Sequence, residues 1–108
     1  MPIKIRGIRN MLTGKEKRFL RSLANTMEPI VQVGKAGVNE SVLFSLQEAL
    51  QARELVTVRV LKNCLDEVQD VAQELALESQ SELVQTIGRN VLLYRPNPEK
   101  PVIELPTK

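Results

Sequence analysis

With 108 residues, 43% of them hydrophobic, and a formal net charge of only +2, the chain is long enough for one domain with one core. Leu, Val, Ile and Ala must build that core, because the chain contains two Phe, one Tyr and no Trp. Its single cysteine excludes an internal disulfide, and no segment approaches the ~18 apolar residues of a membrane span. No apolar segment follows the N-terminal charges, so we expect no secretory signal and a cytoplasmic protein.

The charges are distributed unevenly along the chain. Residues 1–37 contain eight Lys or Arg and two acids, whereas residues 38–88 contain three basic residues and nine acids. Residues 89–108 are again basic, with four Lys or Arg and two Glu. This asymmetry predicts one basic face suited to a polyanion and one acidic face that turns away from it.

Residues 1–11 carry basic residues without periodicity, and we expect an extended N-terminal arm. A helix is predicted over 14–26, because Thr13 and Glu16 have the spacing of a capping box. One side of this helix is apolar: Phe19, Leu20, Leu23 and Met27. The opposite side carries three cations: Lys17, Arg18 and Arg21. They are either an ordinary solvated face or, since they lack acidic i+4 partners, part of a binding surface.

An apolar run predicts a strand over 30–33, and Asn39 is placed as the N-cap of a second helix over 39–53. Between them lies the motif G-K-A-G at residues 34–37. Two glycines allow a ligand to approach the main chain, and the helix start behind them supplies unpaired N–H groups. Together with the lysine, this arrangement favours an anion. The alternative is a tight turn that needs glycine and binds nothing.

The second helix has a predicted buried stripe: Val42, Leu43, Leu46, Ala49 and Leu50. Phe44 lies off this stripe, where it either covers the helix flank or forms an exposed docking surface. Alternation and valine content predict a strand over 55–61. Two further strands, at 82–87 and 91–95, are separated by the turn Gly88-Arg89-Asn90 and must therefore form an antiparallel hairpin. After Pro96 we expect an extended tail, with a short edge strand at 102–105.

A third helix is predicted over about 63–78. Its inward side would hold Cys64, Leu65, Val68, Val71, Ala72, Leu75 and Ala76. Its outward side would hold Asp66, Glu67, Asp70, Glu74 and Glu78. Acids at this spacing could bind a metal or take part in acid–base chemistry, but a solvated face fits better because the chain contains no histidine. Because no histidine is present to activate its thiol, Cys64 is predicted to be a core residue rather than a nucleophile.

The predicted order α-β-α-β-α-β-β defines an α/β fold, a two-layer sandwich of a four-stranded mixed sheet with three helices. Strand–helix–strand units imply parallel neighbours joined by right-handed crossovers, and the hairpin makes the sheet mixed. The predicted organisation is a basic arm at 1–11, a single domain at 12–97 and a proline-rich extended tail at 98–108.

Enzymatic motifs are missing. A nucleotide-binding P-loop needs G-x-x-x-x-G-K-[ST], but Ala36 follows Gly34-Lys35 and Pro29 stands at the first glycine position. The sequence contains no G-x-G-x-x-G, no C-x-x-C and no Ser/His constellation. We therefore predict that the protein is not an enzyme, and that it has no cofactor, no metal site and no small-molecule substrate.

Single-stranded or looped RNA requires a backbone clamp, nearby cations and a stacking surface. The glycine loop is the predicted clamp, and Tyr94 is the candidate for stacking unless it is buried. The candidate RNA-binding residues are Gly34, Lys35, Ala36, Gly37, Lys15, Lys17, Arg18, Arg21, Arg89 and Arg95.

Several motifs follow one another over residues 11–97: L-T-G-K-E-K-R from Leu12, V-G-K-A-G-V from Val33, E-L-V from Glu54 and I-G-R-N-V-L-L-Y-R-P from Ile87. Together they resemble the CRM domain (chloroplast RNA splicing and ribosome maturation), whose stand-alone bacterial form is the YhbY-like protein. The resemblance implies an RNA-binding module associated with precursors of the large ribosomal subunit. It also implies a fold like the C-terminal domain of translation initiation factor three, and a G-x-x-G loop used as in KH domains.

Some positions depart from the family pattern: Ala36 stands where Asn is common, Thr57 where Lys is common, and Asn25-Thr26 where a His-His pair is common. The resulting expectation is RNA binding in large-subunit assembly, with ribosomal RNA or pre-ribosomal particles as the partner and no membrane association. The alternative is a ribosome-associated protein–protein adaptor that makes no direct RNA contact and uses the acidic third helix or Phe44.

Overall fold

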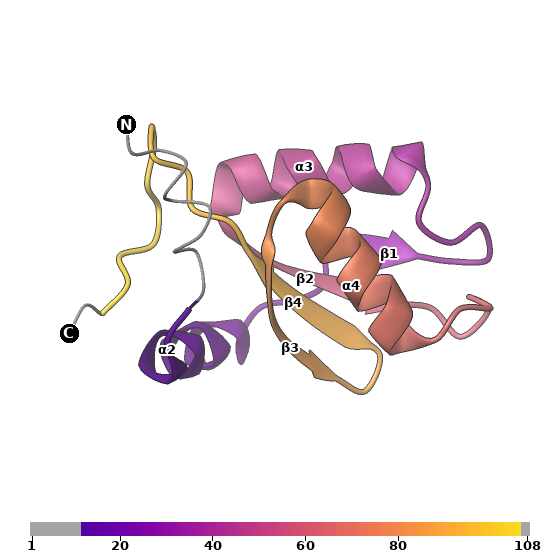
Figure 1. Cartoon of the computed structure of the whole chain (residues 1–108), viewed down its shortest axis with the longest axis horizontal. Helices are drawn as coiled ribbons and strands as arrows, with labels where there is room; N and C mark the ends of the chain where they lie inside the picture. Colours follow the sequence, from indigo (N-terminus) through magenta and orange to yellow (C-terminus); the bar gives the residue numbers. More distant parts are fainter. Residues whose placement is uncertain (1–11, 107–108) are drawn as a thin grey trace.

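The computed structural model describes residues 12–106, so the predicted arm at 1–11 lies outside the described residues. Three helices and a four-stranded mixed sheet confirm the predicted α/β fold class (Figure 1). The elements, in chain order, are α2 (Gly14–Ala24), β1 (Val31–Val33), α3 (Glu40–Arg53), β2 (Leu55–Val60), α4 (Val68–Ser79), β3 (Glu82–Ile87) and β4 (Asn90–Tyr94). Within 12–106, no helix is long and apolar enough to cross a membrane.

The strands lie in the order β1-β2-β4-β3. β1 and β2 are parallel, as the intervening helix α3 predicts. β4 pairs antiparallel with both β2 and β3, which confirms the predicted hairpin. Because β4 is inserted between β2 and β3, the crossover through α4 joins two strands that are not neighbours. The carboxyl ends of β1 and β2 and the hairpin turn therefore lie at one end of the sheet.

Both faces of the sheet are covered (Figure 1). α3 and α4 pack on one face, over a core that includes Leu46, Val58 and Leu75. α2 packs on the other face, over Leu55, Leu92 and Tyr94. The prediction had two layers, and α2 adds a third because β2 and β4 are apolar on both sides. Consecutive apolar residues in β4 were the sequence signal for this double burial.

Cap residues set the starts of α2 and α3 as predicted, whereas the start of α4 differs from the prediction. Thr13 and Glu16 form the predicted capping box, and Asn39 caps α3 through its side chain. α4 starts later than predicted, at Val68, because a tight turn in which the Cys64 N–H donates to the Leu61 carbonyl holds this stretch in a loop. Cys64 is buried as predicted. The prediction that Leu65 faces inward is wrong, since the side chain is 85% exposed.

The predicted edge strand at 102–105 does not form. The backbone amides of Val102 and Ile103 instead donate to the carboxylate of Glu54, so they are not available for a ladder. Ile103 and Leu105 pack against the α2-side core. The C-terminal segment therefore covers part of the domain, at the same end of the molecule as α2 (Figure 1).

Candidate nucleic-acid interface

The G-x-x-G loop is a hydrogen-bonded turn between β1 and α3. The Gly37 N–H donates to the Gly34 carbonyl at 2.9 Å, and this bond leaves Lys35 and Ala36 exposed at the tip. Gly37 has φ +72°, and a Cβ there would lie 3.3 Å from an oxygen of Asp66, so only glycine suits the position. Gly34 has no such constraint, because a Cβ would meet its neighbours only at 3.6 Å. The two glycines therefore have different roles.

The amino terminus of α3 follows directly behind this turn. The Asn39 side-chain oxygen accepts from the Val42 N–H at 2.9 Å, and the remaining N–H groups of the first turn have no intrahelical partner. Their partial positive charge adds to that of Lys35 and favours an anion. Glu40 and Asp66 oppose this effect, since both are exposed acids close to the loop in the chain or in space.

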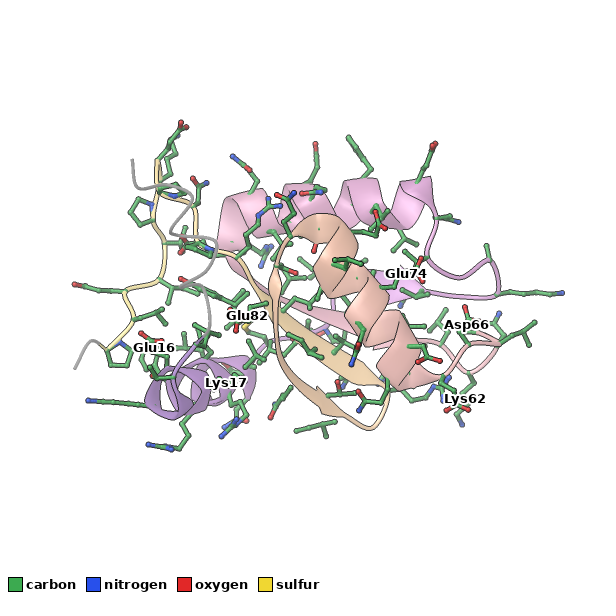
Figure 2. The ribbon with its side chains drawn as sticks, viewed as in Figure 1. Glu16, Lys17, Lys62, Asp66, Glu74 and Glu82 are labelled. Carbon is green, nitrogen blue, oxygen red and sulfur yellow. The ribbon has the colours of Figure 1, made fainter. Side chains whose placement is uncertain are left out.

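A second loop, residues 61–67, runs beside the glycine turn. The Leu61 N–H donates to the Val33 carbonyl at 2.8 Å, which fixes the two loops side by side. Lys62 is exposed on this second loop, at the end of the molecule where β1 and β2 finish (Figure 2). The sequence-based list of site residues lacked Lys62. The parallel pairing of β1 and β2 could have found it, because parallel strands bring the residues after them to one edge.

Arg89, in the hairpin turn, braces this end of the sheet. Its Nε and Nη2 atoms donate to the carbonyls of Val60 and Leu61, each at 2.8 Å. Its own carbonyl accepts from the Val60 N–H at 2.8 Å. The structure thus brings Arg89 close to the glycine loop, as a residue that holds the neighbouring loop in position.

The cations of α2 lie elsewhere. Lys15, Lys17, Arg18 and Arg21 belong to the helix on the opposite sheet face from α3 and α4. Figure 2 shows Lys17 toward one end of the long axis and Lys62 and Asp66 toward the other, in a molecule 41 Å long. The glycine loop and the basic helix therefore do not form one compact patch.

Tyr94 is part of the packed interior, and Arg95 beside it is half-buried. The Arg95 guanidinium donates to the Gln47 side chain and to the Ser79 carbonyl, at the far end of β4 from the hairpin turn. Burial lowers the pKa of Arg95 from its ordinary value, and the group stays protonated at neutral pH. Tyr94 is only 5% exposed, within the α2-side core, and so offers no stacking surface.

Negative charge gathers on the α4 side. Asp70, Glu74 and Glu78 are all exposed on α4, as predicted, and α4 lies across the sheet from α2. Among residues 12–106, no group of three or more His, Cys, Asp or Glu side chains is placed to hold a metal ion. Phe44 is 65% exposed on α3, so it does not cover the helix flank.

Comparisons with known proteins agree on one family. Residues 12–95 match the CRS1/YhbY (CRM) domain. The Bacillus subtilis protein named probable RNA-binding protein YqeI is 54% identical over 96 residues, which cover 89% of this chain and 100% of that protein. An RNA-binding protein of Haemophilus influenzae is 37% identical over 97 residues, 90% of this chain and 97% of that protein.

A solved structure has the same fold. The solution structure of the hypothetical protein SAV1595 from Staphylococcus aureus aligns with a TM-score of 0.75 and 47% sequence identity. The alignment covers 89% of this chain and 100% of SAV1595. The family match spans most of the chain, and both bacterial relatives are covered almost completely. The chain therefore belongs to the CRS1/YhbY (CRM) domain family.

Proposed function

We propose that this protein binds RNA through the tip of its G-x-x-G loop and acts in assembly of the large ribosomal subunit, without catalysis. The observation that carries the proposal is the geometry of the loop. Lys35 and Ala36 project from a turn closed between Gly34 and Gly37, directly before the amino terminus of α3. A phosphate at the tip would meet a lysine charge, accessible backbone and a helix dipole together.

The partner class rests on the family. The relatives that span nearly the whole chain are named RNA-binding proteins, which supports RNA as the ligand. The resemblance to CRM domains supports ribosomal RNA or pre-ribosomal particles in the cytoplasm as the specific target. α2 supplies a second cationic region, which a longer RNA would reach from the loop. Arg89 contributes to this function by holding the loop at 61–67 in position. Arg95 contributes by its packing within the domain.

A double substitution at the tip, Lys35→Asp with Ala36→Asp, tests the proposal. Both side chains are exposed, so we expect stability to change by no more than ~0.5 kcal/mol. Affinity for precursor large-subunit ribosomal RNA should fall at least ~30-fold, about 2 kcal/mol, because a phosphate would meet two carboxylates. Thermal unfolding and RNA affinity are measured on the same preparation.

The matched control changes Ala52 and Arg53 to Asp. They are again one alanine and one basic residue, so the change in charge is the same; both are exposed, and they lie at the other end of α3. A folded loop variant that binds RNA at wild-type strength would contradict the proposed clamp. An equal loss in the control would show that only net charge matters. The single change Lys35→Ala allows the same comparison of stability and RNA affinity with the wild type, through a milder substitution.

A second candidate function is a protein–protein adaptor on the ribosome. A groove of about 1120 Å³ between α2, α4 and β3 favours it. Its lining carries the carboxylates Glu16, Glu74 and Glu82, which Figure 2 labels, and these would repel RNA. Leu77, 75% exposed, adds apolar surface. RNA-independent co-sedimentation with a ribosomal protein would favour this function, whereas strongly salt-dependent RNA binding favours the first.

A further inference from the structure

One row of side chains crosses all four strands near the loop end of the sheet. Gln32 of β1 pairs with Arg59 of β2, Arg59 pairs with Asn90 of β4, and Asn90 pairs with Ile87 of β3. Residues paired across neighbouring strands point to the same face, so these four side chains form a continuous row. With ~4.8 Å between strands, the row is about 14 Å long.

This row lies on the α2 side of the sheet. The neighbours of its members along the strands, including Val33, Val58 and Val91, point into the core under α3 and α4. Alternation therefore directs the row to the other face. On that face α2 covers Leu55 and Leu92, which lie farther from the loop end.

The row extends beyond the cover that α2 provides. Gln32 and Arg59 are exposed, and Ile87 is 62% exposed, although an apolar residue in a sheet is usually covered. The described part of the chain places no element over these three side chains, since the only helix on this face is α2. The result is an open strip of sheet that displays an amide, a guanidinium and an aliphatic side chain together.

The strip lies between the two separate cationic regions. Gln32 is two residues before Gly34, and Arg59 is three residues before Lys62, so the strip leads directly to the loop tip. On its other side is α2, with Lys17, Arg18 and Arg21. The acids of α4 lie across the sheet. Arg59 thus places one positive charge on the α2 face of the sheet, between the loop end and α2.

We infer that this strip is a second RNA contact, which holds a single strand between the glycine loop and α2. The inference rests on the proposed function and specifies how the RNA runs across the molecule. The Arg59 guanidinium would bind a phosphate, the Gln32 amide would hydrogen-bond a base edge or sugar, and Ile87 would contact a base face. RNA is the occupant because the strip joins two cationic regions and carries no acid.

Two pairs of matched variants test the strip with precursor large-subunit ribosomal RNA as the probe. Arg59→Gln removes one charge from the strip, and Arg53→Gln removes the same charge from the exposed end of α3. We expect about a tenfold loss of affinity for Arg59→Gln and less than a twofold loss for Arg53→Gln. Arg59→Lys should recover part of the loss, because a lysine still binds phosphate as a point charge.

The second pair adds a negative charge without changing side-chain size. Gln32→Glu places a carboxylate in the strip, whereas Gln51→Glu places one on exposed α3. RNA affinity should fall at least fivefold for Gln32→Glu and should not fall for Gln51→Glu. The melting temperatures of both variants should equal that of the wild type. If the wild-type protein binds the RNA and Lys35→Asp/Ala36→Asp weakens it, but both strip variants equal their controls, this inference is overturned and the proposed function stands. If the wild-type protein does not bind RNA, the proposed function fails.

Discussion

The carboxylate of Glu54 accepts a hydrogen bond from the backbone N–H of Ile103 at 2.7 Å, although the two residues lie 49 positions apart. The N–H groups of Val102 and Asn97 donate to the same carboxylate. Glu54 ends α3 with φ +65° and is only 1% exposed. Three charge-assisted hydrogen bonds satisfy a buried carboxylate and hold the C-terminal segment against the domain.

Replacing Glu54 with Gln should therefore destabilise the domain. The amide keeps one acceptor oxygen, but its NH₂ group would face a backbone N–H that also needs an acceptor. We expect the free energy of unfolding to fall by about 1–3 kcal/mol, the cost of a buried donor without a partner. Denaturant unfolding measures this loss, and faster amide exchange at Val102 and Ile103 would locate it.

The control for this variant is Glu99→Gln, because Glu99 is exposed in the same C-terminal segment. It should change stability by less than ~0.5 kcal/mol. RNA affinity should be unaffected in both variants, since Glu54 lies at the opposite end of α3 from the glycine loop. Equal stability of the two variants would mean that the C-terminal segment is held by its apolar contacts alone.

The cations of α2 should make RNA binding sensitive to salt. If the whole interface neutralises ~4 phosphates, log K should fall with log salt at a slope of about −3, at ~0.7 per contact for a single strand. Changing Lys17, Arg18 and Arg21 together to Ala should flatten this slope, because three counterion-releasing contacts are lost. The fold should persist, since the capping box of Thr13 and Glu16 and the buried Leu20 are unchanged.

Affinity measured at several salt concentrations, for the wild type and the triple variant, gives both slopes. Circular dichroism at each salt concentration verifies that the variant is folded. An unchanged slope would show that α2 is not part of the RNA-binding surface. Lys35 and its surroundings would then be the whole interface.

Local patterns predicted the helices and strands well, because their determinants are close together in the chain. Thr13 and Glu16 are three residues apart, and the hairpin around Gly88 needs only a short turn between two apolar runs. The start of α4 was harder to predict from the sequence, because the turn at Cys64 depends on the contact of Leu61 with the neighbouring strand. The C-terminal segment could not be placed, because Glu54 is remote from it in sequence.

The candidate site shows the same division between local and long-range information. The glycine turn and its exposed tip follow from residues 34–37 alone. The roles of Arg89 and Arg95 do not, because their hydrogen-bond partners come from distant elements such as β2 and α4. The distance between α2 and the loop depends on which sheet face α2 covers, and helical periodicity contains no information on that choice.

The different constraints on Gly34 and Gly37 allow RNA binding to be separated from folding at the loop. Gly37→Ala should destabilise the domain by about 1–2 kcal/mol, because alanine at φ +72° is strained and its Cβ would crowd Asp66. Gly34→Ala should leave the free energy of unfolding within ~0.5 kcal/mol of the wild-type value, since the added Cβ meets Asn63 and Leu61 at an ordinary 3.6 Å.

RNA affinity is then compared at temperatures where both variants are folded. If RNA comes close to the main chain at Gly34, the methyl group of Gly34→Ala obstructs it, and affinity should fall about tenfold without a change in melting temperature. Gly34→Ser, with a slightly larger side chain, should lose at least as much. Wild-type affinity for both Gly34 variants would mean that the RNA contacts only the projecting side chains at the tip, and that close approach to the backbone is not part of binding.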